Sequence, residues 1–563
     1  MVGLALYPML GMPDSAADAT SRSTCGNEET VRVLALYEAT PRADNLASCP
    51  GILLPVLPRD PGDGPDTVGR LRRHSSTTSP DGRLCLLPIT PPQTIPARLL
   101  RCWIGKMARR FANTAHEGMR LGVARVFCSR RIEFLPGSAF ASLDGEVAAM
   151  RAQGHSVVNL GRADPDHETP RSILDALHEV SGYPESHGYA PYAGTAELRR
   201  QVALWYADRF GVHLDPEREV LILLGSKDGL FHLPFAVLDP GEVALVPDPS
   251  FPAYRVGAYL AGAEVVSLRL YPETDYLPDL GAVDSGVLRK ARLLYLNYPN
   301  NPTGAVAPLG FFREAVSFAD RYGILLCNDL AYADSGYEGY HAPSLLQCED
   351  AKDVAVEFTT WSKTFCMAGW RLGAVVGNAQ AIHSLLRINV QVHSGVWSAI
   401  QHAGAVALRD VVGSGFIDEI NAQYQKRRDV MVSALGSLGI DVIRPWATPY
   451  LWFRAPRGLT SVDAVAWLLR EVGVALAPGS AFGPSGEGFL RMSLTATDDD
   501  IRTAARRLRN IGADGWRSTG RGVAPVMRQS VAREPSAEPE RPDPFPSQWM
   551  RGGDDEPQLL SSL

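Results

Sequence analysis

One segment of the sequence, TTWSKTFCMAGWRLG at 359–373, joins a lysine to hydroxyl side chains and an arginine. Lys363 comes shortly after the apolar run VAVEF, next to Thr360 and Ser362, and Arg371 follows in the same segment. Burial near a sheet edge lowers the pKa of a lysine, so that its amine can form an imine with an aldehyde. The hydroxyl groups and the guanidinium can hold a phosphate. The segment therefore predicts a pyridoxal phosphate site on a short loop; the alternative is a surface loop with an ordinary lysine.

Two further segments place polar side chains at the ends of expected strands. Asn301 lies in NYPNNPTGAV, after the strand-like run RLLYLN, and Asp329 directly follows GILLCN. At the carboxyl ends of strands in a doubly wound sheet, such side chains face the crevice where ligands bind. Asn301 and Tyr332 could then reach a phenolic oxygen of the ring, and Asp329 could pair with a protonated pyridine nitrogen. A strand-ending turn and a helix-capping aspartate are the structural alternatives.

Four more residues could complete such a site. Ser226 and the backbone of Lys227, in LLGSKDGLFHL, begin a helix after a strand, which is an arrangement that binds anions. Phe251 in PDPSFPAY could stack on a pyridine face, although a core position is the alternative. Arg491 in GFLRMSL is flanked by apolar residues within an expected strand, and its planar guanidinium matches a carboxylate. An internal salt bridge is the alternative for Arg491.

These residues belong to a region in which strand-like and helical patterns alternate. Apolar runs at 219–224, 242–247, 292–297, 323–329 and 372–378 are separated by amphipathic segments such as 195–210 and 309–323. Such alternation predicts an α/β fold with a mainly parallel sheet covered by helices on both faces. Beyond about residue 405 the pattern is richer in helices, with expected strands at DVIRP and YLWFRAP, a helix at SVDAVAWLLREVG, and a final strand and helix. A second, smaller α+β domain is expected there.

The composition excludes several classes of protein. The chain has 563 residues, 45% of them hydrophobic and 21% charged, with a net charge of −7, which is typical of globular proteins and gives no support to nucleic-acid binding by the whole molecule. We find no apolar stretch long enough to span a membrane and no secretory signal. The eight cysteines form no CxxC pair, so we expect reduced thiols, no metal site and a cytoplasmic location.

The two ends of the chain differ from its middle. Residues 1–130 are proline-broken and poor in periodic patterns, so we expect a poorly ordered extension with at most one helix near 98–127. An alternative is that translation starts downstream, for example at Met107 or Met119. From Ala513 a segment rich in Pro, Glu and Arg predicts a disordered tail.

The motifs together resemble one known family. GYAPYAGTAELR, GSKDG, PDPSFPAY, YPNNPTGAV, NDLAY, SKTF…GWRLG and FLRMSL occur in this order over about 131–512. They are similar to the class I/II aminotransferases of pyridoxal phosphate fold type I, and in particular to the LL-diaminopimelate aminotransferase-like subgroup. The resemblance implies a large domain with a mainly parallel seven-stranded sheet and a smaller α+β domain. We place the arm and part of the small domain at 131–184, the large domain at 185–405 and the small C-terminal domain at 406–512.

The resemblance also implies roles for single residues. Lys363 would be the Schiff-base lysine that shuttles the α-proton, Asp329 would pair with the pyridinium, and Arg491 would bind the substrate carboxylate. Tyr189 resembles the tyrosine that reaches the neighbouring subunit's phosphate, which implies a homodimer. The remaining cofactor contacts would come from Ser226, Lys227, Phe251, Asn301, Tyr332, Thr360, Ser362 and Arg371. The chain departs from the family pattern at Ala163, where a glycine is usual near the substrate carboxylate, and also at Phe251 and Thr360.

The expected reaction is transamination between an α-amino acid and a 2-oxo acid. Other reactions on the same site remain open, namely those of a lyase, a cyclase or an oxidase, since the chemistry is shared up to removal of the α-proton. A further alternative is a transcription regulator that carries a DNA-binding head within residues 1–130. That extension shows no clear helix-turn-helix pattern. The motifs do not identify the amino donor or acceptor.

Overall fold

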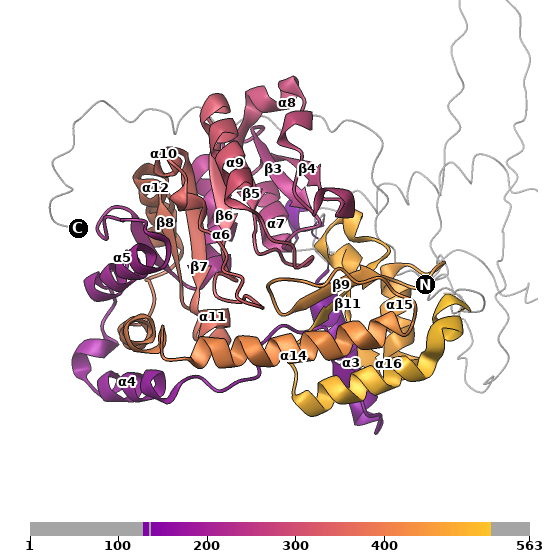
Figure 1. Cartoon of the computed structure of the whole chain (residues 1–563). Helices are drawn as coiled ribbons and strands as arrows, with labels where there is room; N and C mark the ends of the chain where they lie inside the picture. Colours follow the sequence, from indigo (N-terminus) through magenta and orange to yellow (C-terminus); the bar gives the residue numbers. More distant parts are fainter. Residues whose placement is uncertain (1–127, 134, 136, 519–563) are drawn as a thin grey trace, which may run out of the picture. The chain divides into compact units, whose positions relative to one another are not determined.

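A seven-stranded sheet forms the centre of the residues that the computed structural model describes, which are 128–133, 135 and 137–518 (Figure 1). Its strand order is β2-β8-β7-β6-β5-β3-β4, and every pairing is parallel except the two that β8 makes. The predicted fold class is therefore confirmed. The strands are β2 (Val220–Leu223), β3 (Val243–Asp248), β4 (Glu264–Arg269), β5 (Ala291–Leu296), β6 (Leu325–Asp329), β7 (Ala355–Thr360) and β8 (Gly373–Gly377).

Helices cover both faces of this sheet because its central strands are apolar on both sides. On β5, for example, Leu294 packs into one buried cluster and Tyr295 into the other. The first cluster includes α5 (Ala196–Phe210), α9 (Leu309–Tyr322) and α13 (Ser398–Val406). The second includes α6 (Ser226–Val237), α7 (Pro252–Leu260) and α12 (Ala379–Val392). Shorter helices are α4 (Arg171–Ser181), α8 (Ser285–Lys290), α10 (Ala351–Val354) and α11 (Trp361–Thr364).

A separate apolar core holds the smaller α+β part. Its antiparallel sheet has the order β11-β12-β9, and β1 pairs with β10 in parallel. The long helices α14 and α16 lie side by side along this part, with α3 close to it (Figure 1). The elements are α3 (Ala139–Ala152), β1 (Val158–Asn159), α14 (Phe416–Gly436), β9 (Tyr450–Arg454), α15 (Ser461–Trp467), β10 (Val474–Ala475), β11 (Ala477–Pro478), β12 (Phe489–Ser493) and α16 (Asp498–Ser518).

Three local expectations differ from the structure. The strand predicted at DVIRP is wrong, since residues 441–445 have no regular structure. Strand β4 is not among the predicted strands, because it is an edge strand whose exposed positions hide the apolar signal of a buried one. The tail is expected to begin at Ala513, but after a break at Gly512, which has a φ of +69°, helical residues run on to Ser518 and Trp516 is buried in the core of the smaller part. Residues 1–127 and 519–563, including the helix expected near 98–127, lie outside the described residues, and the proposed domain limits stay predictions.

The described residues contain neither a membrane-spanning helix nor a cluster of metal-ligating side chains. None of the helices there is long and apolar enough to cross a membrane. Within the same part of the chain, the His, Cys, Asp and Glu side chains form no group of three or more that could hold a metal ion.

Candidate active site

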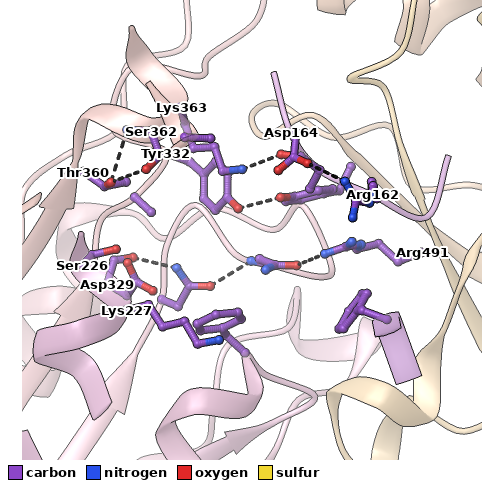
Figure 2. Close-up of a pocket in the computed structure, with 18 of the residues that line it drawn as sticks. Arg162, Asp164, Ser226, Lys227, Asp329, Tyr332, Thr360, Ser362, Lys363 and Arg491 are labelled. Carbon is purple, nitrogen blue, oxygen red and sulfur yellow. Dashed lines mark hydrogen bonds and ion pairs between the residues drawn. The ribbon is translucent and has the colours of Figure 1, made fainter. Parts of the chain in front are cut away.

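Polar side chains from several strands meet at one edge of the large sheet. The parallel strands β2, β3, β5, β6 and β7 end there, and the antiparallel strand β8 begins there. A cavity of about 420 Å³ opens at this edge and is closed on its other side by β12 and the segment before α4 (Figure 2). The predicted site residues that line it are Ala163, Ser226, Lys227, Phe251, Asn301, Asp329, Tyr332, Thr360, Ser362, Lys363, Arg371 and Arg491.

Lys363 does not lie on a loop, as the sequence predicts, but on the single-turn helix α11. This helix begins directly after β7 because Thr360 caps it, its Oγ1 accepting a hydrogen bond of 3.2 Å from the backbone N–H of Ser362. The side chain of Lys363 donates a hydrogen bond through Nζ to the backbone carbonyl of Ala163. The short helix thus aims the amine across the cavity, where a carbonyl oxygen holds it in place.

An anion-binding cradle lies beside Lys363. Ser226 begins α6 directly after Gly225, so the first N–H groups of a 12-residue helix face the cavity. Gly225 has a φ of +79°, and a Cβ there would come within 2.5 Å of Arg371 Nη2. A Cβ on Gly373 would lie 2.5 Å from the backbone nitrogen of Ser226. The two glycines therefore let Arg371 and the start of β8 pack closely against the first residues of α6, next to the Thr360 and Ser362 hydroxyls that line the cavity.

Asp329 is a buried carboxylate with one oxygen unused. It ends β6, is 5% exposed, and accepts a hydrogen bond of 2.6 Å from Tyr254 through Oδ2. Its Oδ1 has no hydrogen-bond partner among the described residues. Burial raises the pKa of Asp329 to about 6, while the hydrogen bonds from Tyr254 and the Ala331 backbone act in the opposite direction. Such a carboxylate is suited to a cationic partner supplied by a ligand.

Arg491 is the corresponding buried cation on the opposite side. It lies on β12, is 3% exposed, and donates to Asn301 Oδ1 at 3.0 Å and to the Gly161 carbonyl at 2.9 Å. Its Nε has no partner within the described residues, and no carboxylate there pairs with it. Burial lowers the pKa of Arg491. An internal salt bridge is thus not found in the described part, and the guanidinium is placed to receive an anionic ligand.

Aromatic residues close the remaining walls of the cavity. Tyr332 and Tyr450 share a hydrogen bond of 2.7 Å between their hydroxyl groups, and burial raises the pKa of Tyr332 well above its usual range. The Arg491 guanidinium lies 4.5 Å from the centre of the Tyr450 ring. Phe251 precedes α7, and the Lys227 ammonium lies 5.8 Å from its ring centre. These rings offer flat apolar surfaces next to the polar groups.

Tyr189 is the one predicted site residue that does not line the cavity. It is 90% exposed on the described chain. Conversely, several residues that line the cavity or support it are absent from the sequence-based prediction. These are Phe140, Asp144, Arg162, Asp164, Asn297, Tyr254 and Tyr450.

Some of these additional residues lie within or next to motifs that the sequence analysis identified, and others do not. Tyr254 lies three positions after Phe251 in PDPSFPAY, and Arg162 and Asp164 flank Ala163 in LGRADPD. Asn297 starts the motif that contains Asn301; it donates to the Asp329 carbonyl at 2.6 Å and accepts from the Asn301 N–H at 2.8 Å. Asp144 and Phe140 lie on α3, where nothing in the sequence pattern connects them to the site.

The residues present fit pyridoxal phosphate. The unpartnered Asp329 oxygen suits a pyridinium nitrogen, and the α6 N-terminus at Ser226, with Thr360, Ser362 and Arg371 in the same cavity lining, suits a phosphate. Lys363 lies in the same cavity as both. The arrangement can hold an aldehyde near an amine, keep a ring nitrogen protonated, and bind a carboxylate through Arg491.

Known proteins resemble this chain over the same region. The family model for aminotransferase class I and II matches residues 155–508. An LL-diaminopimelate aminotransferase of Halothermothrix orenii is 42% identical over 380 residues, which are 68% of this chain and 97% of that protein. Another, of Moorella thermoacetica, is 43% identical over 383 residues, 68% of this chain and 98% of that protein.

Solved structures agree with this similarity. Substrate-bound BacF of Bacillus subtilis has a TM-score of 0.66 at 35% identity, covering 68% of this chain and 97% of BacF. A probable N-succinyldiaminopimelate aminotransferase of Thermus thermophilus has a TM-score of 0.62 at 37% identity, covering 66% of this chain and all of that one.

Proposed function

The chain belongs to the class I and II aminotransferases, and we propose that Lys363 is the residue through which it carries out that family's reaction. It is a pyridoxal phosphate-dependent enzyme that moves an amino group between an α-amino acid and a 2-oxo acid. One observation carries the assignment of the site: Lys363, Asp329 and Arg491 line one cavity, and the latter two each keep an unpartnered atom among the described residues.

Each group in the cavity then has a chemical task. When bound, pyridoxal phosphate supplies an aldehyde that takes up the amino group and a ring that accepts the electron pair left by the α-proton. Lys363 would hold the cofactor covalently and, once displaced by substrate, would carry that proton on Nζ. Asp329, oriented by Tyr254, would keep the ring nitrogen protonated.

The remaining groups bind and orient. The α6 N-terminus at Ser226 and Lys227, the Thr360 and Ser362 hydroxyls, and Arg371 would hold the phosphate. Phe251 would stack on the ring, and Asn301 and Tyr332 would contact its phenolic oxygen. Arg491 would bind the substrate α-carboxylate while its hydrogen bond to Asn301 fixes the guanidinium plane. Ala163 would act through its carbonyl, which holds Lys363 Nζ, and its methyl group would narrow the space beside Arg491.

Replacement of Lys363 tests this assignment. In Lys363→Ala, transfer of the amino group to 2-oxoglutarate should fall by roughly 10⁴-fold, because proton transfer at the α carbon loses its carrier. The visible absorbance of the lysine-bonded cofactor should disappear. Lys352→Ala is a control, since Lys352 pairs with Glu219 outside the cavity. If Lys363→Ala kept both the absorbance and the turnover, the role of Lys363 would be wrong.

We infer that the amino donor is LL-diaminopimelate or a close analogue. The inference is supported by two relatives of that name that are 42% and 43% identical and are matched over nearly their full length. A panel of amino donors with 2-oxoglutarate and pyruvate as acceptors tests it. We expect LL-diaminopimelate to give the highest kcat/KM. A clear preference for a monoamino donor would contradict the inference.

We also propose a cytoplasmic homodimer with shared active sites. The exposure of Tyr189 supports it, because a tyrosine that serves the partner's phosphate must project away from its own cavity. Light scattering of the full chain should give twice the monomer mass. Tyr189→Phe should weaken cofactor affinity; unchanged affinity, or a monomer in solution, would contradict the shared site.

A further inference from the structure

Three charged residues form a group at the end of the cavity away from the phosphate cradle. Arg162 holds Asp144 by two hydrogen bonds, from Nε at 3.0 Å and from Nη2 at 2.9 Å. It meets Asp164 only at 3.4 Å, through Nη1. We call Arg162, Asp144 and Asp164 the mouth cluster. All three line the cavity, and Figure 2 shows Arg162 and Asp164 on the side of Arg491, away from Ser226 and Thr360.

The segment 161–163 ties the mouth cluster to the reacting groups. The Gly161 carbonyl accepts from Arg491 at 2.9 Å, and the Ala163 carbonyl accepts from Lys363. Arg162, between them, sends its side chain to Asp144 on α3 instead. The cofactor and the α-carboxylate already have their binding groups elsewhere. The mouth cluster therefore faces the only part of a substrate that is left, which is its side chain.

Helix α3 runs from the Arg491 guanidinium, where the α-carboxylate would bind, to the mouth cluster. The Arg491 guanidinium lies 5.5 Å from the Phe140 ring centre, and Asp144 comes one helical turn later on the same face. Four residues of α-helix span about 6 Å, which a chain of a few methylene groups also spans. A side chain that runs along Phe140 from an α-carboxylate at Arg491 would end at the mouth cluster.

The charge of the mouth cluster determines which chemical group at the end of a substrate side chain it can bind. Its two carboxylates and one guanidinium carry a net negative charge, and both oxygens of Asp144 are taken by Arg162. The excess negative charge therefore resides on Asp164, whose side chain is 66% exposed. We propose that Asp164 binds an ammonium group at the far end of the substrate side chain, so that the enzyme selects diamino acids. Asp144 is a positioning residue that keeps the Arg162 guanidinium from neutralising Asp164.

This proposal rests on the aminotransferase function above and can be tested separately from it. Two matched donor pairs differ only in the distal ammonium group: LL-diaminopimelate with L-2-aminopimelate, and L-lysine with L-norleucine. In the full-length holoenzyme, the ammonium-bearing member of each pair should have the higher kcat/KM. Asp164→Asn should reduce that preference about tenfold. The loss should appear in KM rather than kcat, because the contact is equal in ground and transition states.

Two further variants separate a binding role from a structural one. Asp144→Asn should lower the same preference to a smaller degree, since Arg162 is then free to pair with Asp164. Asp410→Asn is the matched control: Asp410 has the same two-point contact with Arg409 but lies outside the cavity. It should leave all four donors unchanged.

The outcomes distinguish the two proposals. If Asp164→Asn leaves the preference within each pair unchanged, or if the wild type prefers the donors without an ammonium group, the mouth cluster does not bind ammonium. If another donor reacts but LL-diaminopimelate does not, the substrate inferred above is wrong, and the lysine pair still decides the role of Asp164. If no amino acid transfers its amino group, the function itself is wrong.

Discussion

Asp329 and Asp144 both line the active-site cavity, but the first ends a buried strand and the second lies on a half-exposed helix. Among the described residues, Asp329 has a tyrosine hydroxyl and a backbone group as its partners, and burial raises its pKa to about 6. Asp144 is held by the Arg162 guanidinium, and its pKa is lowered by that hydrogen bond. The same chemical group is thus costly to ionise at one end of the cavity and easy to ionise at the other.

In the roles proposed above, this difference separates the cofactor-binding end of the cavity from the end that selects the substrate. The Asp329 end is built from strand ends fixed by the sheet, so its groups stay in place and keep an uncompensated charge for a ligand. The mouth cluster is built from exposed side chains on α3 and a loop, where a charge pair contributes little to stability. Side chains there can vary without loss of the fold, which suits a region that decides among substrates.

Of the changes to the charged groups at the two ends of the cavity, removal of the buried carboxylate should have the largest effect. Asp329→Ala should lower kcat/KM for amino transfer by roughly 10³-fold, because the ring nitrogen loses the charge that keeps it protonated. Steady-state rates with the best amino donor would measure the loss. Asp410→Asn, on the surface, should have no effect. A loss below tenfold for Asp329→Ala would show that the two ends of the cavity do not differ as described.

Replacement of Asp329 should lower activity but raise the stability of the protein without cofactor. Because the folded pKa of Asp329 is raised from 3.8 to about 6, the native state without cofactor binds more protons than the unfolded state over that range. Its unfolding free energy therefore falls as the pH rises from about 4 to 6. Apo Asp329→Asn should be more stable than the apo wild type at pH 7 by up to about 3 kcal/mol.

Urea unfolding at several pH values measures this difference. The gain should shrink as the pH is lowered toward 4, where the wild-type carboxyl is protonated in both states. Equal stability of the two apo proteins at pH 7 would mean that the Asp329 charge is compensated by something other than a ligand.

The substrate carboxylate contact should have an intermediate effect. Arg491→Lys keeps the charge but loses the planar two-point contact and the bond to Asn301. We expect kcat/KM to fall about 30-fold, since hydrogen bonds to charged groups are worth about 1.5–3 kcal/mol. Cofactor affinity should stay unchanged, measured by absorbance titration. A matched loss for an amine that lacks the α-carboxylate would contradict the assigned contact.

The smallest effect should come from Asp144. Its folded pKa is lowered, so the stability it contributes is present above its ordinary pKa of 3.8 and is lost as the pH falls through the folded value. The pair with Arg162 is exposed, and Asp144→Asn should cost less than about 1 kcal/mol at pH 7. Urea unfolding would show that this loss of stability becomes smaller as the pH is lowered. The gain in stability of Asp329→Asn also becomes smaller in acid, so the two variants approach the wild type from opposite sides.

The sequence determined those features that depend on local pattern. Alternating apolar runs predicted the mainly parallel sheet, motifs at the strand ends identified Lys363, Asp329 and Asn301 as cavity residues, and the apolar flanks of Arg491 within a strand pointed to a buried cation. This succeeds because parallel strands bring their carboxyl ends to one edge wherever they lie in the order. A buried arginine or aspartate also predicts a partner by itself, even before that partner is known.

Only the tertiary structure decided which side chains meet. Tyr254 bonds Asp329 across 75 positions, and Arg162 bonds Asp144 on a helix that no motif linked to the site. Lys363 lies on a helical turn rather than a loop because Thr360 caps it after β7. Such contacts depend on how separate elements pack and on the rotamers that packing allows. The order of residues along the chain specifies neither the packing nor the rotamers. The contact of Tyr254 with Asp329 and the whole of the mouth cluster are therefore seen only in the tertiary structure.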